Sequence, residues 1–152
     1  MLHVGVCDDE QILARRLGAS LRKMFAERGV DAGISIFLSG KRLLEKAELL
    51  DLVFLDIDMP FLDGVETGKR LRLRNPDCAI VMVSAMEHRM KEGYVVGARR
   101  FVTKPVEMEE LREAVDAVLE ISPGTEQIRL FLNNHPYEVR QNQIDYLEAY
   151  NG

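Results

Sequence analysis

The stretch DLVFLDIDMP, residues 51–60, places an uninterrupted apolar run directly before a group of aspartates. Residues 52–55 are all apolar, which is typical of a strand buried on both faces of a sheet. Asp56 and Asp58 follow where this strand ends. Ligands of open α/β sheets bind beyond the carboxyl ends of the strands. The stretch therefore predicts a buried parallel strand that delivers carboxylates to a site.

Short apolar runs recur on both sides of this stretch and alternate with segments of helical periodicity. The predicted strands are residues 2–7, 34–38, 51–56, 79–84 and 99–103. The predicted helices are residues 12–25, 41–48, 64–74, 88–96 and 107–120. Five strand–helix units with apolar strands predict an α/β fold of the doubly wound class, in which helices cover both faces of a parallel sheet.

Composition and charge restrict the class of protein. The chain has 152 residues, 47% hydrophobic and 30% charged, which suits a folded domain and excludes a disordered chain. Twenty basic and 25 acidic residues give a net charge of −5, so no overall positive field attracts nucleic acid or an anionic membrane. The apolar runs are too short for a membrane span, and the acidic residues 8–10 come too early for a signal peptide. We therefore expect a soluble, cytoplasmic protein with no membrane partner.

Polar residues that could take part in a reaction lie at the carboxyl ends of four predicted strands. Asp8 and Asp9 follow the first strand, Asp56 ends the third, Ser84 ends the fourth, and Lys104 follows the fifth. Such ends converge on one edge of a doubly wound sheet. Three carboxylates in one pocket repel one another unless a cation neutralises them, and oxygen ligands suit Mg²⁺. Together with a lysine and a hydroxyl, they predict phosphoryl transfer to an aspartate.

Each of these residues also has a simpler interpretation. Residues 8–10 could cap the first helix, and Asp56 could cap a turn before Pro60. Ser84 could be a hydroxyl that only satisfies a local hydrogen bond, and Lys104 a solvated loop residue. Their joint occurrence at the correct strand ends favours a common site over separate structural roles.

Over residues 1–120 the chain resembles the receiver domain of two-component response regulators. The motifs that carry this resemblance occur in the family's order: Asp8-Asp9, residues 52–60, Asp63-Gly64, Ser84-Ala85 and Thr103-Lys104-Pro105. The resemblance implies a flavodoxin-like sheet of strand order 2-1-3-4-5. It also implies a signalling domain, not an enzyme, that receives a phosphoryl group from a sensor histidine kinase.

The resemblance assigns the phosphoryl site residue by residue. It makes Asp56 the phosphoacceptor of a phosphorelay and Mg²⁺ the cofactor. Asp8, Asp9, Asp56 and the backbone carbonyl of Asp58 are the implied metal ligands. Lys104 is implied to pair with the phosphoryl group.

The resemblance also implies a two-state switch built from Ser84 and Phe101. Ser84 is the implied switch hydroxyl, which would donate a hydrogen bond to the phosphoryl group. Phe101 occupies the family's aromatic switch position, where simple core packing is the alternative interpretation. Activation is expected to form a homodimer through charged residues of the last strand and helix, namely Arg99, Arg100, Glu109, Glu110 and Asp116.

Two other functions compete with the receiver interpretation. The Asp-x-Asp at residues 56–58 is similar to the nucleophile motif of haloacid-dehalogenase-type phosphatases. In that family the motif ends the first strand and the acidic metal pair comes late, whereas Asp8-Asp9 comes first here. The other alternative is an interaction module that is never phosphorylated, and it is disfavoured because every member of the expected pocket is present.

The C-terminal segment carries a second resemblance. The composition of residues 121–126 predicts a linker. Within residues 127–152, apolar residues alternate with polar ones as in short strands, at Ile128, Leu130 and Leu132, at Tyr137 and Val139, and again at Ile144 and Tyr146. The segment from Ile128 to Val139, followed by the run QIDYLEA at residues 143–149, is similar to the opening strands of a LytTR-type DNA-binding domain. That domain is several times longer, so we expect a β-rich fragment of it, with DNA bound only through the missing part of the full-length protein. An unrelated β-hairpin is the alternative.

Overall fold

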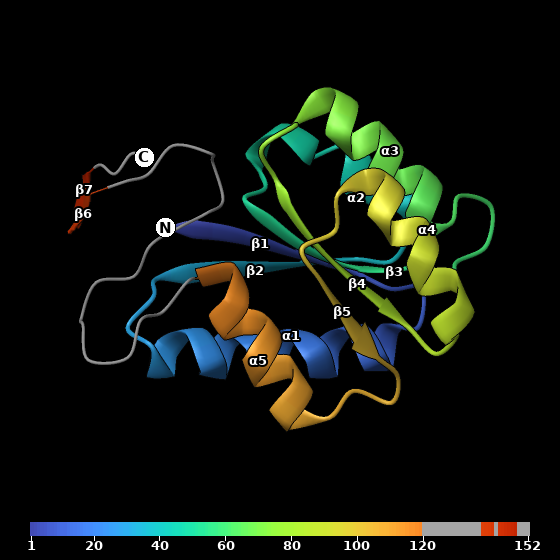
Figure 1. Ribbon diagram of the computed structural model, residues 1–152, viewed down its shortest axis with the longest axis horizontal. Coiled ribbons are helices and arrows are strands. Elements are labelled where there is room, and N and C mark those ends of the chain that lie inside the picture. Colours follow the sequence, from blue (N-terminus) through green and yellow to red (C-terminus); the bar gives the residue numbers. More distant parts are fainter. Residues whose placement is uncertain (120–137, 142, 149–152) are drawn as a thin grey trace.

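The computed structural model describes residues 1–119, 138–141 and 143–148. Its centre is a parallel sheet of five strands in the order β2-β1-β3-β4-β5, as predicted (Figure 1). The strands are β1 (Leu2–Cys7), β2 (Ala32–Phe37), β3 (Leu52–Asp56), β4 (Ala79–Ser84) and β5 (Arg100–Thr103). The doubly wound α/β fold expected from the apolar runs is therefore confirmed.

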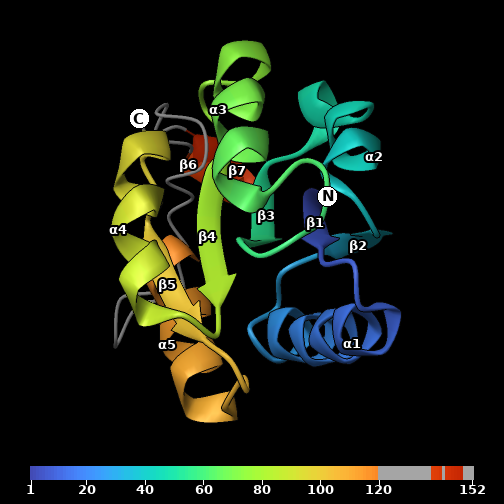
Figure 2. The same cartoon turned by 90° about the vertical axis from the view of Figure 1, so that its right-hand side faces the viewer.

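Helices cover both faces of this sheet (Figures 1 and 2). One face carries α1 (Gln11–Glu27) and α5 (Met108–Leu119). The other face carries α2 (Gly40–Leu44), α3 (Gly64–Arg74) and α4 (Met90–Gly93). In residues 1–119, where all the described helices lie, none is long and apolar enough to cross a membrane.

β3, which lies within the stretch of residues 51–60, is at the centre of the core. All five residues of β3 are buried, and successive side chains point to opposite faces. Phe54 packs in the cluster under α1 and α5, whereas Val53 and Leu55 pack in the cluster under α2 and α3. Because β3 is buried on both faces, its apolar run is continuous rather than alternating.

Two predicted helices are shorter than their periodicity suggested. The helix predicted over residues 41–48 ends at Leu44 and is followed by a 3₁₀ turn at Ala47–Leu49. Arg74 donates to the backbone carbonyl of Leu44 at 2.7 Å, and Asn75 donates to the carbonyls of Ala47 and Leu50 at 2.9 and 2.8 Å. Side chains from the end of α3 thus satisfy carbonyls that a longer helix would have used.

The helix predicted over residues 88–96 is also broken into short pieces. It consists of a 3₁₀ turn at Glu87–Arg89, the single turn of α4, and a 3₁₀ turn at Tyr94–Val96. A Cβ atom added to Gly93 would lie 2.6 Å from Cε1 of Phe101. This segment therefore follows the surface of β5 closely, and Gly97 ends it in a left-handed conformation at φ 69°.

The described part of the C-terminal segment is an antiparallel pair of strands. These are β6 (Glu138–Gln141) and β7 (Gln143–Glu148), which form a two-stranded sheet of their own. Their positions agree with the β structure expected around Val139 and Ile144. The predicted linker 121–126 and the alternating residues 128–132 lie outside the described residues.

Candidate functional site

The carboxyl ends of β1 and β3 bring three aspartates together. The two strands are parallel neighbours that pair Cys7 with Leu55, so the next residues, Asp8 and Asp56, leave the sheet side by side. One carboxylate oxygen from each of Asp8, Asp9 and Asp56 lies within 4.8 Å of the others. Asp8 and Asp56 are buried and Asp9 is exposed. The sequence correctly predicted this cluster from the strand ends.

Lys104 reaches this cluster from the end of β5. Its Nζ lies 2.8 Å from Oδ2 of Asp8 and 3.3 Å from Oδ1 of Asp56. Ser84 pairs with Thr103 in the adjacent strand, which fixes the backbone position of Lys104, the next residue. The Lys104 amide also donates to the Ser84 carbonyl at 3.0 Å. Three carboxylates against one ammonium leave two net negative charges when all four groups are ionised. The cluster therefore favours a further cation.

The environment shifts the proton affinity of both partners. Burial raises the pKa of the Asp56 carboxyl to about 7, while Lys104 opposes this rise and Asp8 adds to it. Burial acts to lower the pKa of Lys104, but its hydrogen bond to Asp8 and the charge of Asp56 outweigh burial and raise it. Lys104 therefore keeps its positive charge at neutral pH. A cation that joined the cluster would favour the ionised form of Asp56 and so lower its pKa.

Ser84 is buried, and the hydrogen bonds of its hydroxyl go to Asp58 and Met86 and not to Asp56. Its hydroxyl donates to Oδ2 of Asp58 at 3.1 Å and accepts from the Met86 amide at 3.0 Å. Asp58 follows β3 by two residues, and its amide donates to Oδ1 of Asp56 at 3.3 Å. The structure thus gathers Asp8, Asp9, Asp56 and Lys104, and holds Ser84 beside the Asp58 side chain.

Comparison with known families agrees with this geometry. Residues 4–116 match the family model described as the response regulator receiver domain. The chain belongs to this family. The sequence resemblance drawn from the strand-end motifs is therefore confirmed for the receiver domain, and the order of motifs disfavours the phosphatase alternative.

Two relatives of this receiver domain are regulatory proteins by name. It is 29% identical to the transcriptional regulatory protein RprY of Bacteroides fragilis over 78% of the chain and 49% of that protein. It is 31% identical to the positive alginate biosynthesis regulatory protein of Pseudomonas aeruginosa, over 75% of the chain and 46% of that protein. The chain thus spans about half the length of these curated relatives.

A solved structure confirms the fold. The chemotaxis protein CheY4 of Vibrio cholerae superposes with a TM-score of 0.65 and 25% identity, covering 78% of this chain and 99% of that one. The flavodoxin-like strand order of the receiver domain is the arrangement found in Figure 1.

Phe101 lies on β5 of the receiver domain, on the face covered by α4. Its ring is partly buried and meets the ring of Tyr94 edge-on, with ring centroids 5.1 Å apart. It also packs against the core cluster of that face. This placement agrees with the packing interpretation, and the switch role of Phe101 stays a prediction.

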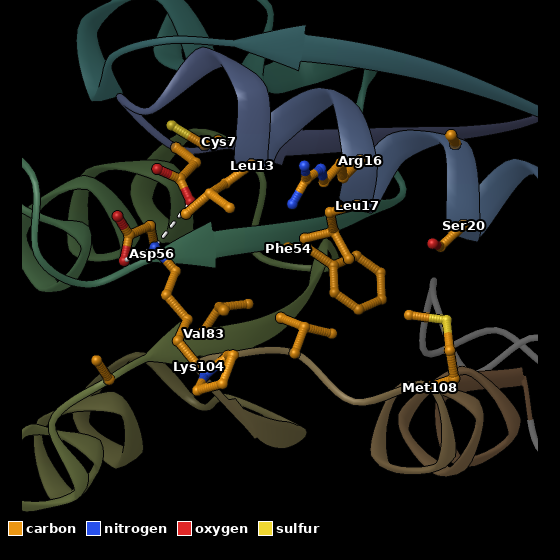
Figure 3. A pocket seen from close by; sticks show the side chains of 15 residues that line it. Cys7, Leu13, Arg16, Leu17, Ser20, Phe54, Asp56, Val83, Lys104 and Met108 are labelled. Atoms are coloured by element: carbon orange, nitrogen blue, oxygen red, sulfur yellow. Dashed lines mark hydrogen bonds and ion pairs between the residues drawn. The ribbon is translucent and has the colours of Figure 1, made fainter.

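A groove opens beside Asp56 in the receiver domain. Between α1 and residues 104–108 lies a cavity of about 630 Å³ that Asp56 and Lys104 border at one end (Figure 3). Arg16 contributes a positive charge from α1. The remaining wall is mainly apolar and includes Leu13, Leu17, Phe54, Val83, Val106 and Met108.

Two predicted dimer-forming acids of the receiver domain have partners within the chain. Asp116 lies 2.6 Å from the Arg28 guanidinium, and Glu110 accepts from the amide and hydroxyl of Thr103 at 3.1 and 2.8 Å. They are therefore less available for pairs between chains than the sequence suggested. Sequence reasoning also missed Arg89, which contacts Asp58 at 3.1 Å, because no motif marks this position.

Proposed function

We propose that Asp56 accepts a phosphoryl group from the phosphohistidine of a sensor histidine kinase. The observation that carries this proposal is the buried Asp56 carboxylate, which is 3.3 Å from Lys104 and clustered with Asp8 and Asp9. An Asp56 oxygen attacks phosphorus, the bond from phosphorus to the histidine nitrogen breaks, and the imidazole leaves. Lys104 is placed to stabilise the charge that collects on the phosphoryl oxygens.

The donor set of the cluster fits Mg²⁺. Its side-chain ligands are all carboxylate oxygens, which hard divalent cations prefer. Asp8, Asp9, Asp56 and the backbone carbonyl of Asp58 are the residues that would hold the ion. When bound, Mg²⁺ supplies positive charge that offsets the charge of the transferred group. Lys104 contacts both Asp8 and Asp56 and remains protonated.

Incubation with acetyl phosphate tests this function without a kinase. The wild-type protein is expected to form an acid-stable, base-labile phosphoprotein when Mg²⁺ is present and not when EDTA replaces it. Undiminished labelling of Asp56→Asn would contradict the assignment of the phosphoacceptor.

The groove beside Asp56 is proposed as the docking site for the kinase. It opens at the phosphoacceptor, its wall is mainly apolar, and Arg16 gives it a positive charge (Figure 3). A histidine delivered along this groove would reach Asp56 while an apolar surface of the kinase covers the exposed side chains of Leu13 and Met108.

Reversing the charge of Arg16 is expected to slow transfer from the kinase. Arg16→Glu should reduce the transfer rate from a phosphorylated kinase by about 10-fold, because interface charges mainly control the association rate. Labelling by acetyl phosphate should not change, since that donor needs no docking surface. Arg22→Glu, the same change at an exposed position of α1 outside the groove, is the control. Equal loss of transfer in both variants would contradict docking in the groove.

The output is proposed to be transcription regulation through a LytTR-type DNA-binding domain. In this proposal, residues 1–120 are the receiver, residues 121–126 the linker and residues 127–152 the start of that domain. Regulatory relatives and the antiparallel pairing of β6 with β7 support it. DNA contacts are assigned to the rest of the full-length protein, because residues 121–152 carry two arginines against four acidic residues.

Phosphorylation is proposed to drive homodimerisation through the face formed by α4, β5 and α5. Arg99 and Arg100 are exposed there, and Glu109 is exposed on α5. Sedimentation should show a monomer in the free protein and a dimer with beryllofluoride and Mg²⁺. The same oligomer under both conditions would contradict this proposal.

A further inference from the structure

Asp58 forms the centre of a polar chain that links two loops at the site. Its Oδ2 accepts the Ser84 hydroxyl at 3.1 Å, and its Oδ1 accepts from Nη1 of Arg89 at 3.1 Å. Ser84 ends β4, whereas Asp58 lies in the loop between β3 and α3. The side chain of Asp58 therefore connects the element that carries the phosphoacceptor to the element that carries the switch hydroxyl.

Arg89 is held by further carboxylates and so keeps Asp58 in place. Its Nη2 lies 3.0 Å from Asp63, and Glu92 accepts from Nε and Nη2 at 3.1 and 2.9 Å. Asp63 itself caps α3 by accepting from the Glu66 amide at 2.9 Å. Charge-assisted bonds of this kind are stronger than neutral ones, and the guanidinium fork fixes their directions. Arg89 is consequently a rigid support for the Asp58 carboxylate.

The Ser84 hydroxyl has a single proton to donate. In this structure that proton is directed to Asp58, with the Met86 carbonyl at 3.4 Å as a weaker second acceptor. A phosphoryl group on Asp56 requires the same proton if Ser84 is to bind it. The two acceptors therefore exclude each other.

We propose that Asp58, positioned by Arg89, competes with the phosphoryl group on Asp56 for the Ser84 hydroxyl and so opposes activation. We call Asp58 and Arg89 the latch. The proposal rests on the proposed phosphorylation of Asp56. Both members of the latch are positioning residues, because they act through Ser84. Activation then requires the hydroxyl to leave Asp58, and the strength of the latch sets the population of the activated state before phosphorylation.

Beryllofluoride affinity in a double-mutant cycle tests the latch. Asp58→Ala is expected to lower the beryllofluoride dissociation constant in the presence of Mg²⁺ by about 10-fold, since a hydrogen bond to a charged acceptor no longer has to break. In a Ser84→Ala background the same substitution should have little effect, because no hydroxyl remains to compete for. An equal gain in both backgrounds would show a simple charge effect and overturn the latch.

Asp63→Asn is the matched control for loss of a negative charge. This variant removes the charge of a carboxylate that contacts Arg89, and it keeps Asp58, the acceptor of the Ser84 hydroxyl. Asparagine at this position can still cap α3. The amide oxygen of asparagine can still accept from Arg89, so Arg89 keeps its position and the dissociation constant for beryllofluoride should stay close to that of the wild type. A gain as large as that of Asp58→Ala would also overturn the proposal.

Amide chemical shifts of the metal-free protein give a readout that needs no phosphoryl analogue. Asp58→Ala should move the Met86 and Thr103 resonances part of the way toward their beryllofluoride-bound positions. Arg89→Gln should move these resonances in the same direction. The double variant Asp58→Ala/Arg89→Gln should show no larger movement than Asp58→Ala alone. If Asp58→Ala did not move these resonances toward their beryllofluoride-bound positions, the latch would be overturned even if the wild type binds beryllofluoride. Failure of the wild type to bind beryllofluoride would instead refute the proposed function and, with it, the latch.

Discussion

Replacing Asp56 with asparagine is expected to stabilise the metal-free protein by up to about 4 kcal/mol above pH 8. Burial, opposed by Lys104 and reinforced by Asp8, raises the pKa of this carboxyl from 3.8 to about 7. Between these two values the folded protein retains a proton that the unfolded chain has released. The free energy of unfolding of the wild type therefore falls as the pH rises from about 4 to about 7.

Denaturant unfolding in EDTA at several pH values measures this effect. Asp56→Asn should match the wild type near pH 4 and exceed it increasingly toward pH 8. Asp31→Asn, the same change at an exposed carboxylate, should show no such gain. Mg²⁺ should stabilise the wild type more than Asp56→Asn, because the variant lacks one proposed ligand. A gain that is equal at pH 4 and pH 8 would contradict the electrostatic cause.

Removing the Lys104 ammonium is expected to slow phosphorylation of Asp56 by about 10²-fold. Lys104 lies 2.8 Å from Asp8 and 3.3 Å from Asp56, so Lys104→Ala removes the cation that faces the reacting carboxylate. The phosphoryl oxygens would then lose a preorganised positive charge in a buried site. Single-turnover labelling with acetyl phosphate and Mg²⁺ measures the rate.

Lys91→Ala serves as the control for this second substitution, since Lys91 is an exposed lysine of α4. Its labelling rate should equal that of the wild type. If Lys104→Ala also kept the wild-type rate while remaining folded, Lys104 would have no role in the transfer.

The sequence predicted those parts of the fold that depend on local pattern. The continuous apolar run of β3 follows from burial on both faces, and α3 has its predicted bounds at residues 64–74. The break after Leu44 was not predictable, because it depends on Arg74 and Asn75, which lie about 30 residues away in the chain. Periodicity reports which face of a segment is buried, and not which distant side chain ends it.

The candidate site, like the fold, could be predicted only in part from the sequence. Asp8, Asp56 and Lys104 meet because parallel strands end at one edge of a sheet, and this could be predicted from the strand ends alone. The contact of Ser84 with Asp58 depends on loop conformation and on Arg89, which no sequence pattern marks. For the same reason the partners of Asp116 and Glu110 became visible only in the structure.

The position of the phosphoryl group tests the central claim most directly. After reaction with acetyl phosphate and Mg²⁺, borohydride reduction of the acyl phosphate followed by peptide mass spectrometry would mark the modified carboxylate. The expected result is modification of Asp56 alone, lost in EDTA and in Asp56→Asn. Modification of Asp8, Asp9 or Asp58 in place of Asp56, or no modification of the folded wild type, would contradict Asp56 as the phosphoacceptor.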